Sequence, residues 1–173
     1  MSDFVCESTD WFVVRTNSRH EKKVACLLEK LNYQVYLPIQ KQWRIWSDRK
    51  KLIEVPLIPG VIFVHDCTVN KEKLYSVPGF HSILKLNGEI GRVKPKEIEQ
   101  LKLVLEEYEG VEKVENSRFS RGEEVEIIAG PLRGYFAKAV EDVNSYRVII
   151  CIEALAAKFV VNLAKSKVRK LVK

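Results

Sequence analysis

The C-terminal fold is decided by the stretch FSRGEEVEIIAGPLRGY, residues 119–135. Its glycines have the chemistry of turns, since glycine adopts backbone angles that other residues avoid. Gly122 is expected to set a turn into a strand, Gly130-Pro131 to start a tight loop, and Gly134 to let the chain re-enter a barrel without a Cβ clash. We expect the tip of this loop, Leu132-Arg133, to be presented to a partner.

Short β-type runs continue from this stretch toward the end of the chain. They cover residues 125–128, 135–140, 146–152 and 159–163, and Gly, Pro and Asn-Ser separate them. This spacing is typical of a small barrel. The segment from Glu153 to Lys158 is an exception, because strong helix formers occupy a place where a barrel needs an extended or turning chain.

The first half of the chain mixes helices with strands. Trp11 to Thr16 is a β-branched and aromatic run, and Val61 to Val64 is a continuous apolar run that predicts a strand buried on both faces. Between them, Ser18 to Glu21 has the pattern of a capping box, in which the Ser18 hydroxyl and the Glu21 carboxylate each bond a backbone N–H. This pattern predicts that a helix starts there.

The helix that follows has apolar residues at i, i+3, i+4 and i+7, so one of its faces is expected to pack on the sheet. These residues are Val24, Leu27, Leu28 and Leu31. A later helix is predicted from Pro95, because the first turn of a helix tolerates proline.

A charged, aperiodic segment separates the two halves and has the composition of a linker. We predict an N-terminal domain over residues 9–109, a linker over 110–118 and a C-terminal domain over 119–173. The fold class is α+β, with an antiparallel sheet and flanking helices in the first domain and a small β-barrel in the second.

The composition is that of a globular protein, with 46% hydrophobic and 30% charged residues. No run of about 18 apolar residues is present, so we expect no membrane span. The first ten residues carry acids and no apolar stretch, which predicts the absence of a secretory signal and a cytoplasmic location. The net charge of +6, from 29 basic and 23 acidic residues, is compatible with a polyanionic partner.

The sequence contains no motif for catalysis or metal binding. The four cysteines lie far apart without a Cys-x-x-Cys pair, and the three histidines are scattered. Phosphate-binding loops, nucleophile elbows and the His-Glu-x-x-His pattern are all missing. We therefore expect no enzyme activity, no metal and no cofactor.

Residues 119–135 resemble the KOW motif, which NusG-type elongation factors share with several ribosomal proteins. The pattern Gly-x-x-Val…Gly-Pro-x-x-Gly carries this resemblance, which extends from about Phe119 to the end of the chain. In the first half, Trp11 to Arg15, Pro59 to Val64 and Val77 to Phe80 resemble the NusG N-terminal (NGN) domain in order and spacing. Together these resemblances imply an NGN domain linked to a KOW β-barrel.

Within that superfamily, Ser18 to Ala25, Val35 to Pro38 and Trp46 to Lys51 resemble the UpxY group. Its members are specialised NusG paralogues that promote transcription through capsule or exopolysaccharide operons. The resemblance implies a transcription antitermination factor that suppresses pausing and termination. A general NusG elongation factor and a KOW-type protein that binds RNA or the ribosome are the alternatives.

In the family, the NGN domain docks on the clamp helices of the largest RNA polymerase subunit. The resemblance places this contact at Pro59, Val61 and Phe63, although alternate residues of such a strand can equally belong to the core. A second polymerase contact is implied in the short helix that follows. Its residues are Lys71, Glu72 and Lys73.

The basic start of the first helix corresponds to the region that specialised relatives place against the non-template DNA strand. Lysine and arginine attract phosphate, and arginine or histidine can also reach a splayed base. The residues are Arg15, Arg19, His20, Lys22 and Lys23. The alternative is an ordinary solvated helix face.

A predicted hairpin forms a second basic and aromatic cluster. Trp43 and Trp46 flank its basic residues, which are Arg44 and residues 49–51. We expect the tryptophans to pack the hairpin on the sheet rather than to stack on bases.

The KOW domain of relatives binds ribosomal protein S10 or termination factor Rho through the loop that matches Ala154 to Lys158. Relatives carry a Phe-Gly-Arg type sequence there, whereas this chain has Leu155-Ala156-Ala157, so both partners stay open. Leu155 is the candidate apolar contact in this loop, beside Leu132 and Arg133 in the other. The helix formers of the loop also suggest that the domain refolds or masks the NGN domain, as in the RfaH branch.

Overall fold

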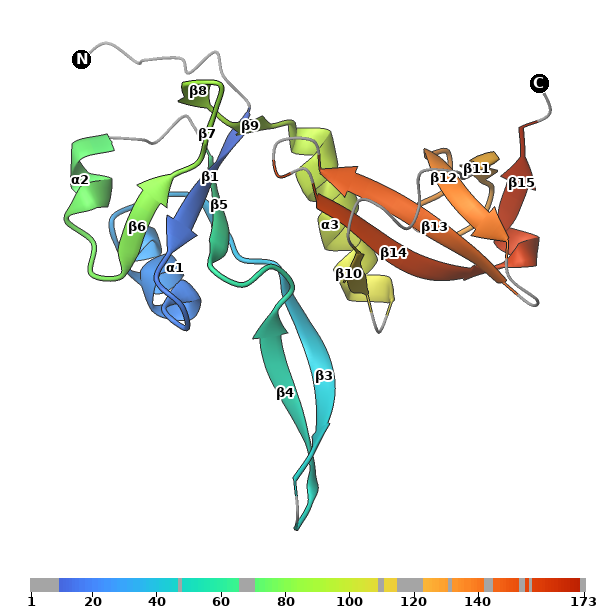
Figure 1. Cartoon of the computed structure of the whole chain (residues 1–173), viewed down its shortest axis with the longest axis horizontal. Helices are drawn as coiled ribbons and strands as arrows, with labels where there is room; N and C mark the ends of the chain where they lie inside the picture. Colours follow the sequence, from blue (N-terminus) through green and yellow to red (C-terminus); the bar gives the residue numbers. More distant parts are fainter. Residues whose placement is uncertain are drawn as a thin grey trace. The chain divides into compact units, whose positions relative to one another are not determined.

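The structure is a computed structural model that describes residues 10–46, 48–65, 71–108, 111–114, 123–130, 132–141, 145–152, 155 and 157–171 (Figure 1). At residues 71, 112–114, 141, 150 and 152 it describes the backbone alone. The chain divides into two compact units, one of Met1–Pro38 with Ile58–Ile98 and one of Ile39–Leu57 with Glu99–Lys173.

The first unit contains an antiparallel five-stranded sheet. Its strands are β1 (Trp11–Thr16), β2 (Val35–Tyr36), β5 (Val61–His65), β6 (Phe80–Ile83) and β9 (Arg92–Val93). They pair in the order β2-β5-β1-β6, and β9 also pairs with β1. The prediction of a buried central strand at residues 61–64 is confirmed, because β5 lies between β2 and β1 and its first four side chains are buried.

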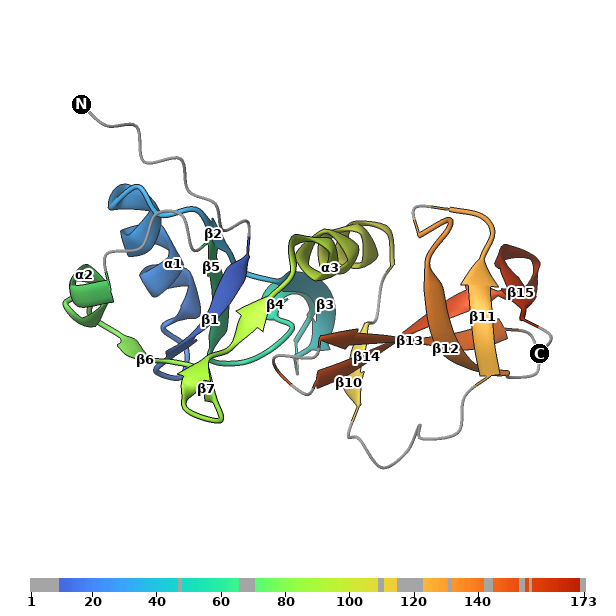
Figure 2. The ribbon, with the colours of Figure 1, turned by 90° about the horizontal axis from the view of Figure 1, so that it is seen from above.

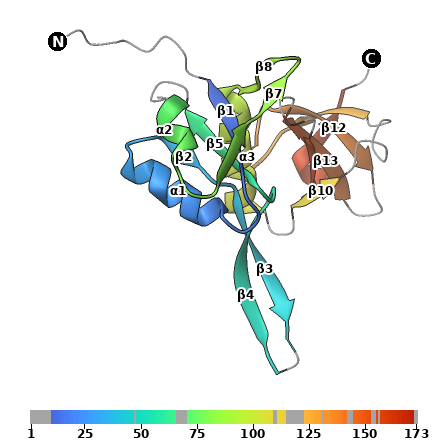
Figure 3. The same ribbon diagram turned by 60° about the vertical axis from the view of Figure 1, so that its left-hand side comes forward.

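Helix α1 (Glu21–Lys30) covers one face of this sheet, as Figure 3 shows. Its Val24 and Leu28 are fully buried in one cluster with sheet residues that include Phe12 and Ile62. Leu27 is partly buried against this cluster, whereas Leu31 is exposed. The predicted apolar face is therefore confirmed except at its last position, where the helix ends and the chain turns away through Asn32 at a φ of 63°.

The capping box predicted at Ser18 to Glu21 is wrong. Arg19 has a φ of 61°, which turns the backbone so that His20 becomes the N-cap, and no side chain caps the helix. Glu21 is then the first helical residue and not the third, as a capping box requires. Its buried carboxylate instead accepts a hydrogen bond of 2.8 Å from the backbone N–H of Gly60, which is 39 residues away in sequence.

The other elements of the first unit are a five-residue helix, a short hairpin and the start of a longer helix, whose residues from Glu99 onward belong to the second unit. Helix α2 (Lys71–Tyr75) precedes β6, and helix α3 (Pro95–Glu107) begins at the predicted proline. Strands β7 (Lys85–Leu86) and β8 (Glu89–Ile90) form a hairpin whose two turn residues, Asn87 and Gly88, both have positive φ. Such angles at both positions are those of the tight turn that Asn-Gly favours.

The second unit contains an antiparallel six-stranded sheet (Figure 2). Its strands pair in the order β10-β14-β13-β12-β11-β15. They are β10 (Glu112–Val114), β11 (Glu123–Ile127), β12 (Phe136–Glu141), β13 (Ser145–Ile152), β14 (Ala157–Ala164) and β15 (Val168–Lys170). Within the described residues no pairing joins β10 to β15, so the closed barrel stays a prediction.

Two strands of this sheet were not predicted from the sequence. Strand β10 lies inside the segment expected to be a linker and pairs with β14, and β15 pairs with β11. Both are three residues long, which gives too few positions for an alternating pattern to be recognised. The helix-forming segment 153–158 connects β13 to β14, which pair up to Ile152 and Ala157. Within this segment, Ala157 and Lys158 belong to β14, and residues 153, 154 and 156 lie outside the described residues.

Backbone conformation, and not the lack of space for a Cβ, explains why glycine occurs at position 134. Gly130 and Gly134 have φ of 88° and 83°, and a Cβ on Gly134 would meet nothing within 4 Å. Backbone conformation therefore requires glycine at 134, and the expected Cβ clash is wrong. Gly122 and Pro131 lie outside the described residues.

Strands β3 (Ile39–Ile45) and β4 (Lys50–Pro56) form a two-stranded ribbon of their own. Within the part of the chain that the structure describes, neither pairs with another strand. Trp43 and Trp46 are exposed on this ribbon. The expectation that they pack the hairpin on the sheet is therefore wrong.

We predict that Glu21→Ala lowers the free energy of unfolding by about 1.5–3 kcal/mol, because it leaves the N–H of Gly60 without its acceptor in a part-buried site. Glu21→Gln keeps an oxygen for this bond and is expected to lose less. Urea denaturation of both variants measures the difference. Equal stability of Glu21→Ala and the unchanged chain would contradict the role given to this bond.

Candidate functional site

The strand predicted to contact the polymerase is buried on both faces. Ile62 and Val64 face the cluster beneath α1, and the alternation of a strand places Val61 and Phe63 on the opposite face. Phe63 is 0% exposed, and its ring stacks on Tyr36 with centroids 6.1 Å apart. Phe63 therefore has no free surface in this structure.

The opposite face of the sheet is apolar beyond β5. Trp11 and Val13 on β1 are buried, and they pair in register with His65 and Phe63. The Trp11 and His65 rings meet edge to face at 5.2 Å. Pro59, just before β5, is exposed. Of the three residues predicted for this contact, only Pro59 offers its surface directly.

The second predicted contact lies on the five-residue helix α2. Leu74 is fully buried and fixes this helix to the core, while Glu72 and Lys73 are exposed. The Ser76 hydroxyl donates a hydrogen bond of 2.7 Å to the Lys73 carbonyl. The side chain of Lys71 lies outside the described residues. Two polar side chains of α2 are thus available at the surface.

The basic residues before and at the start of α1 form a set that we call the basic loop: Arg15, Arg19, His20, Lys22 and Lys23. Its four arginines and lysines are exposed, and His20 is half-buried. The one acid within the set's span, Glu21, points inward to Gly60. The exposed charge of this segment is therefore uniformly positive.

Backbone hydrogen bonds hold the basic loop in place. The N–H of Thr16 donates to the Gly60 carbonyl at 2.9 Å, and the N–H of Asn17 donates to the Gly79 carbonyl at 2.8 Å. His20 Nδ1 lies 3.0 Å from the Ser18 carbonyl. Two backbone hydrogen bonds thus tie the start of the loop to two glycine turns that are distant in sequence.

Gly79 packs directly beneath His20. Its φ is 95°, and a Cβ there would lie 3.0 Å from both Cβ and Cδ2 of His20. The sequence predicts only that Pro78-Gly79 ends a helix. Its close approach to the basic loop depends on the tertiary fold.

The predicted contacts in the C-terminal unit fare differently. Leu132 is fully buried, so the expectation that it is presented at a loop tip is wrong: its side chain fills the core, while Arg133 is exposed. Leu155 is half-buried. Phe136 on β12 is exposed and was missed. Phe136 lies opposite Glu126 in the sheet. The side chain of Glu126 forms a salt bridge with Arg169 at the surface, so the side chain of Phe136 lies on the same solvent-facing side.

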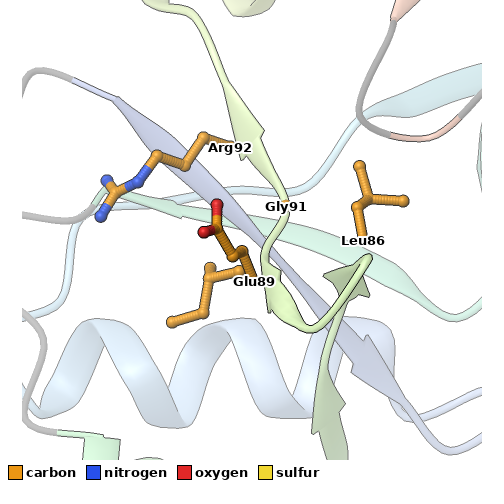
Figure 4. A pocket seen from close by; sticks show the side chains of 5 residues that line it. Leu86, Glu89, Gly91 and Arg92 are labelled. Atoms are coloured by element: carbon orange, nitrogen blue, oxygen red, sulfur yellow. The ribbon is translucent and has the colours of Figure 1, made fainter.

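Two hollows are lined by residues that the structure describes. One, of about 540 Å³, is lined by the β7–β8 hairpin and the residues after it (Figure 4). Glu89 and Arg92 are its charged residues, and the picture shows Leu86 on the other side of the turn. The hollow contains no nucleophile beside a base.

Another hollow is lined by the base of the β3–β4 ribbon and the end of α3, including Tyr108. Burial raises the pKa of the Tyr108 hydroxyl, and the neighbouring Glu107 raises it further. Both effects favour the neutral phenol. Among the described residues, no group of three His, Cys, Asp or Glu side chains is arranged to hold a metal ion.

None of the helices that the structure describes has the length and apolar composition that crossing a membrane requires. Comparison with protein families gives one match, in which a model described as "Transcription termination factor nusG" covers residues 9–102. That span is more than half of the chain. The chain belongs to the NusG family. The matched residues include both the basic loop and strand β5.

One solved structure of a NusG protein is similar to this chain over nearly its whole length. The structure described as "Domain interaction in Thermotoga maritima NusG" is 29% identical, covers 94% of this chain and 97% of that one, and has a TM-score of 0.58. The structure described as "Crystal Structure of MjSpt4:Spt5 complex conformation A" is 23% identical over 94% of this chain and 99% of that chain, with a TM-score of 0.30. No curated protein matches the chain.

We predict that Gly79→Ala destabilises this NusG-family chain more than Gly88→Ala does. Both glycines have positive φ, which costs about 1–2 kcal/mol for a residue with a Cβ. Only at Gly79 does the new Cβ also press on His20, whereas nothing lies within 4 Å at Gly88.

Thermal unfolding of both variants measures the difference, and the NMR signals of the His20 ring report whether the loop shifts. Equal losses with an unmoved His20 ring would contradict the tight packing beneath the basic loop.

Proposed function

We propose that this NusG-family chain is a specialised transcription antitermination factor. It binds the clamp helices of RNA polymerase and the non-template DNA strand, and it suppresses pausing and termination in capsule or other polysaccharide operons. Family membership supports a role in transcription elongation. The resemblance of residues 18–25, 35–38 and 46–51 to the UpxY group supports the specialised role.

The basic loop is the single observation that carries the DNA contact. Four exposed cations lie within nine residues, the acid among them is turned inward, and hydrogen bonds to two glycine turns fix the backbone. A backbone that is already fixed needs no ordering when the cations bind phosphate, which lowers the entropic cost of binding. An ordinary solvated helix face has no such anchors.

The proposed contact with the clamp helices uses Pro59, Val61 and Phe63. The proposed second polymerase contact uses Lys71, Glu72 and Lys73 of α2. Because Phe63 is fully buried in this structure, its contact with the clamp requires that this face of the sheet be uncovered first. A protein that contacts both sides of the polymerase cleft binds the closed clamp more tightly than the open one, and this difference in affinity shifts the clamp toward the closed state. Pausing is then suppressed by binding energy, without bond chemistry.

A further contact is proposed for the C-terminal sheet, which we interpret as a KOW domain. Arg133 is exposed and Leu155 is half-buried, so both can reach a partner such as ribosomal protein S10 or Rho. This contact is separate from the polymerase contact, since it uses the other unit of the chain.

The DNA contact is tested by a triple variant, Arg19→Glu, Lys22→Glu and Lys23→Glu. We expect it to lose at least tenfold in antitermination on a template with the cognate leader, because phosphate now meets negative charge. Co-purification with core RNA polymerase is expected to persist.

The matched control changes three other exposed lysines, Lys30, Lys85 and Lys94, to glutamate, with the same change in net charge. It is expected to retain the activity. Equal activity on templates with and without the leader would instead support a general NusG factor, and stable binding to rRNA without polymerase would support a ribosome-binding protein.

The polymerase contact is tested by comparing Phe63→Ala with Ile62→Ala. Both side chains are fully buried on the same strand, so each variant is expected to lose about 2–5 kcal/mol of stability. Only Phe63 lies on the face proposed for the clamp. At a temperature where circular dichroism shows both variants folded, Phe63→Ala should bind polymerase at least tenfold more weakly than Ile62→Ala. Equal binding would place the clamp contact elsewhere.

A further inference from the structure

The ribbon of β3 and β4 is a separate structural element (Figures 1 and 3). Seven cross-strand pairs join its strands, from Ile39 with Pro56 to Ile45 with Lys50. The N–H of Trp46 then donates to the Arg49 carbonyl at 2.8 Å and closes the tip. An isolated two-stranded hairpin is only marginally stable in water. Apolar side chains that stay exposed near its tip therefore contribute little to the free energy of folding.

One face of the distal half is apolar and solvent-exposed. Trp43 lies directly opposite Leu52, and Ile45 lies two residues further along the same strand, so all three side chains are on one face. Their exposed fractions are 63%, 43% and 78%. Trp46, at the tip, is 56% exposed. Single exposed apolar side chains are common on protein surfaces, whereas a contiguous group of them is typical of a binding surface.

The other face of the ribbon is cationic. Arg44 lies directly opposite Lys51, an arrangement of like charges that destabilises a strand pair. Over both faces, residues 41–54 include five basic and two acidic side chains. The register places two of the basic ones, Lys41 and Lys50, on the face of Trp43 and Ile45. One of the acids, Asp48, lies 3.6 Å from Arg49. Among the described residues, no ion pair engages Arg44 or Lys51. An anionic partner would relieve their repulsion.

We propose that this ribbon binds single-stranded nucleic acid. The indole rings of Trp43 and Trp46 stack on unpaired bases, and Lys50, on the same face as Trp43, contacts phosphates. Arg44 and Lys51 contact phosphates where the bound strand passes to the opposite face of the narrow ribbon. A duplex fits less well because its bases are already stacked on one another. A protein partner fits less well too, since three apolar side chains on a narrow ribbon cover less area than a stable protein interface needs.

This surface is independent of the basic loop, because the ribbon and the loop belong to different units of the chain. Nothing on the ribbon is specific for a 2′-hydroxyl group, as stacking and phosphate contacts are common to DNA and RNA. Single-stranded DNA and RNA are therefore expected to bind with similar affinity. The proposal adds a second nucleic-acid contact to the one made by the basic loop.

The test uses the full chain carrying Arg19→Glu, Lys22→Glu and Lys23→Glu, so that the basic loop contributes no binding. The chain has three tryptophans, and Trp11 is buried. Quenching of tryptophan fluorescence by a 12-nucleotide oligo(dT) or oligo(rU) therefore reports on Trp43 and Trp46. Fluorescence anisotropy of labelled oligonucleotides gives the affinity.

We expect both single strands to quench the fluorescence, and Trp43→Ala to weaken binding about tenfold. Phe136→Ala is the matched control, because Phe136 is equally exposed on a strand of the other sheet, and it should bind normally. Arg44→Ala with Lys51→Ala should reduce the slope of log K against log salt by about 0.7 for each phosphate contact removed.

Three results would overturn the proposal. The first is unchanged affinity in Trp43→Ala, the second is a 12-base-pair duplex that binds as tightly as oligo(dT), and the third is a poly-glutamate chain that competes as well as the oligonucleotide. The proposed function is judged separately. If the basic loop were assigned wrongly, the triple variant would keep leader-dependent activity whatever the ribbon does.

Discussion

The first unit depends on one buried carboxylate. Glu21 accepts the N–H of Gly60, while the carbonyl of Gly60 accepts the N–H of Thr16, so a single peptide turn joins the end of β1, the start of α1 and the start of β5. A hydrogen bond to a charged acceptor, shielded from water, is among the stronger ones that proteins contain. It ties two segments 39 residues apart in sequence and sets where α1 begins.

The functional surfaces follow from that arrangement. Because Glu21 points inward, the neighbouring Lys22 and Lys23 are left as the charged side chains on the outside, and the loop before them is fixed by Asn17 against Gly79. The same turn leads directly into β5, whose Phe63 lies on the face proposed for the polymerase. The surfaces proposed to contact nucleic acid and polymerase are therefore both positioned by this one turn.

The sequence predicted the main elements well where the pattern was long and local. The burial of β5 on both faces, the apolar face of α1 except at Leu31, and the proline at the start of α3 were correct. Each depends on residues close together in the chain, where periodicity and turn chemistry act directly.

Other predictions failed because they needed contacts between distant residues. Ser18 and Glu21 have the spacing of a capping box, but a stronger acceptor role for Glu21 at Gly60 displaced it. Leu132 was expected at a loop tip and is buried, and the tryptophans of the ribbon were expected on the sheet and are exposed. The spacing of residues along the chain does not determine which side chains of a turn or hairpin are buried in the core.

The amino-acid sequence by itself thus determined the mixed α and β character of the first half, the β-rich second half and the positive charge near the first helix. The tertiary structure alone decided which of these charges are exposed, how the loop that carries them is held, and that the β3–β4 ribbon leaves its apolar residues in solvent. The physical reason is that periodicity and turn chemistry act over a few residues, whereas burial and hydrogen-bond partners are assigned by chain segments that meet only after folding.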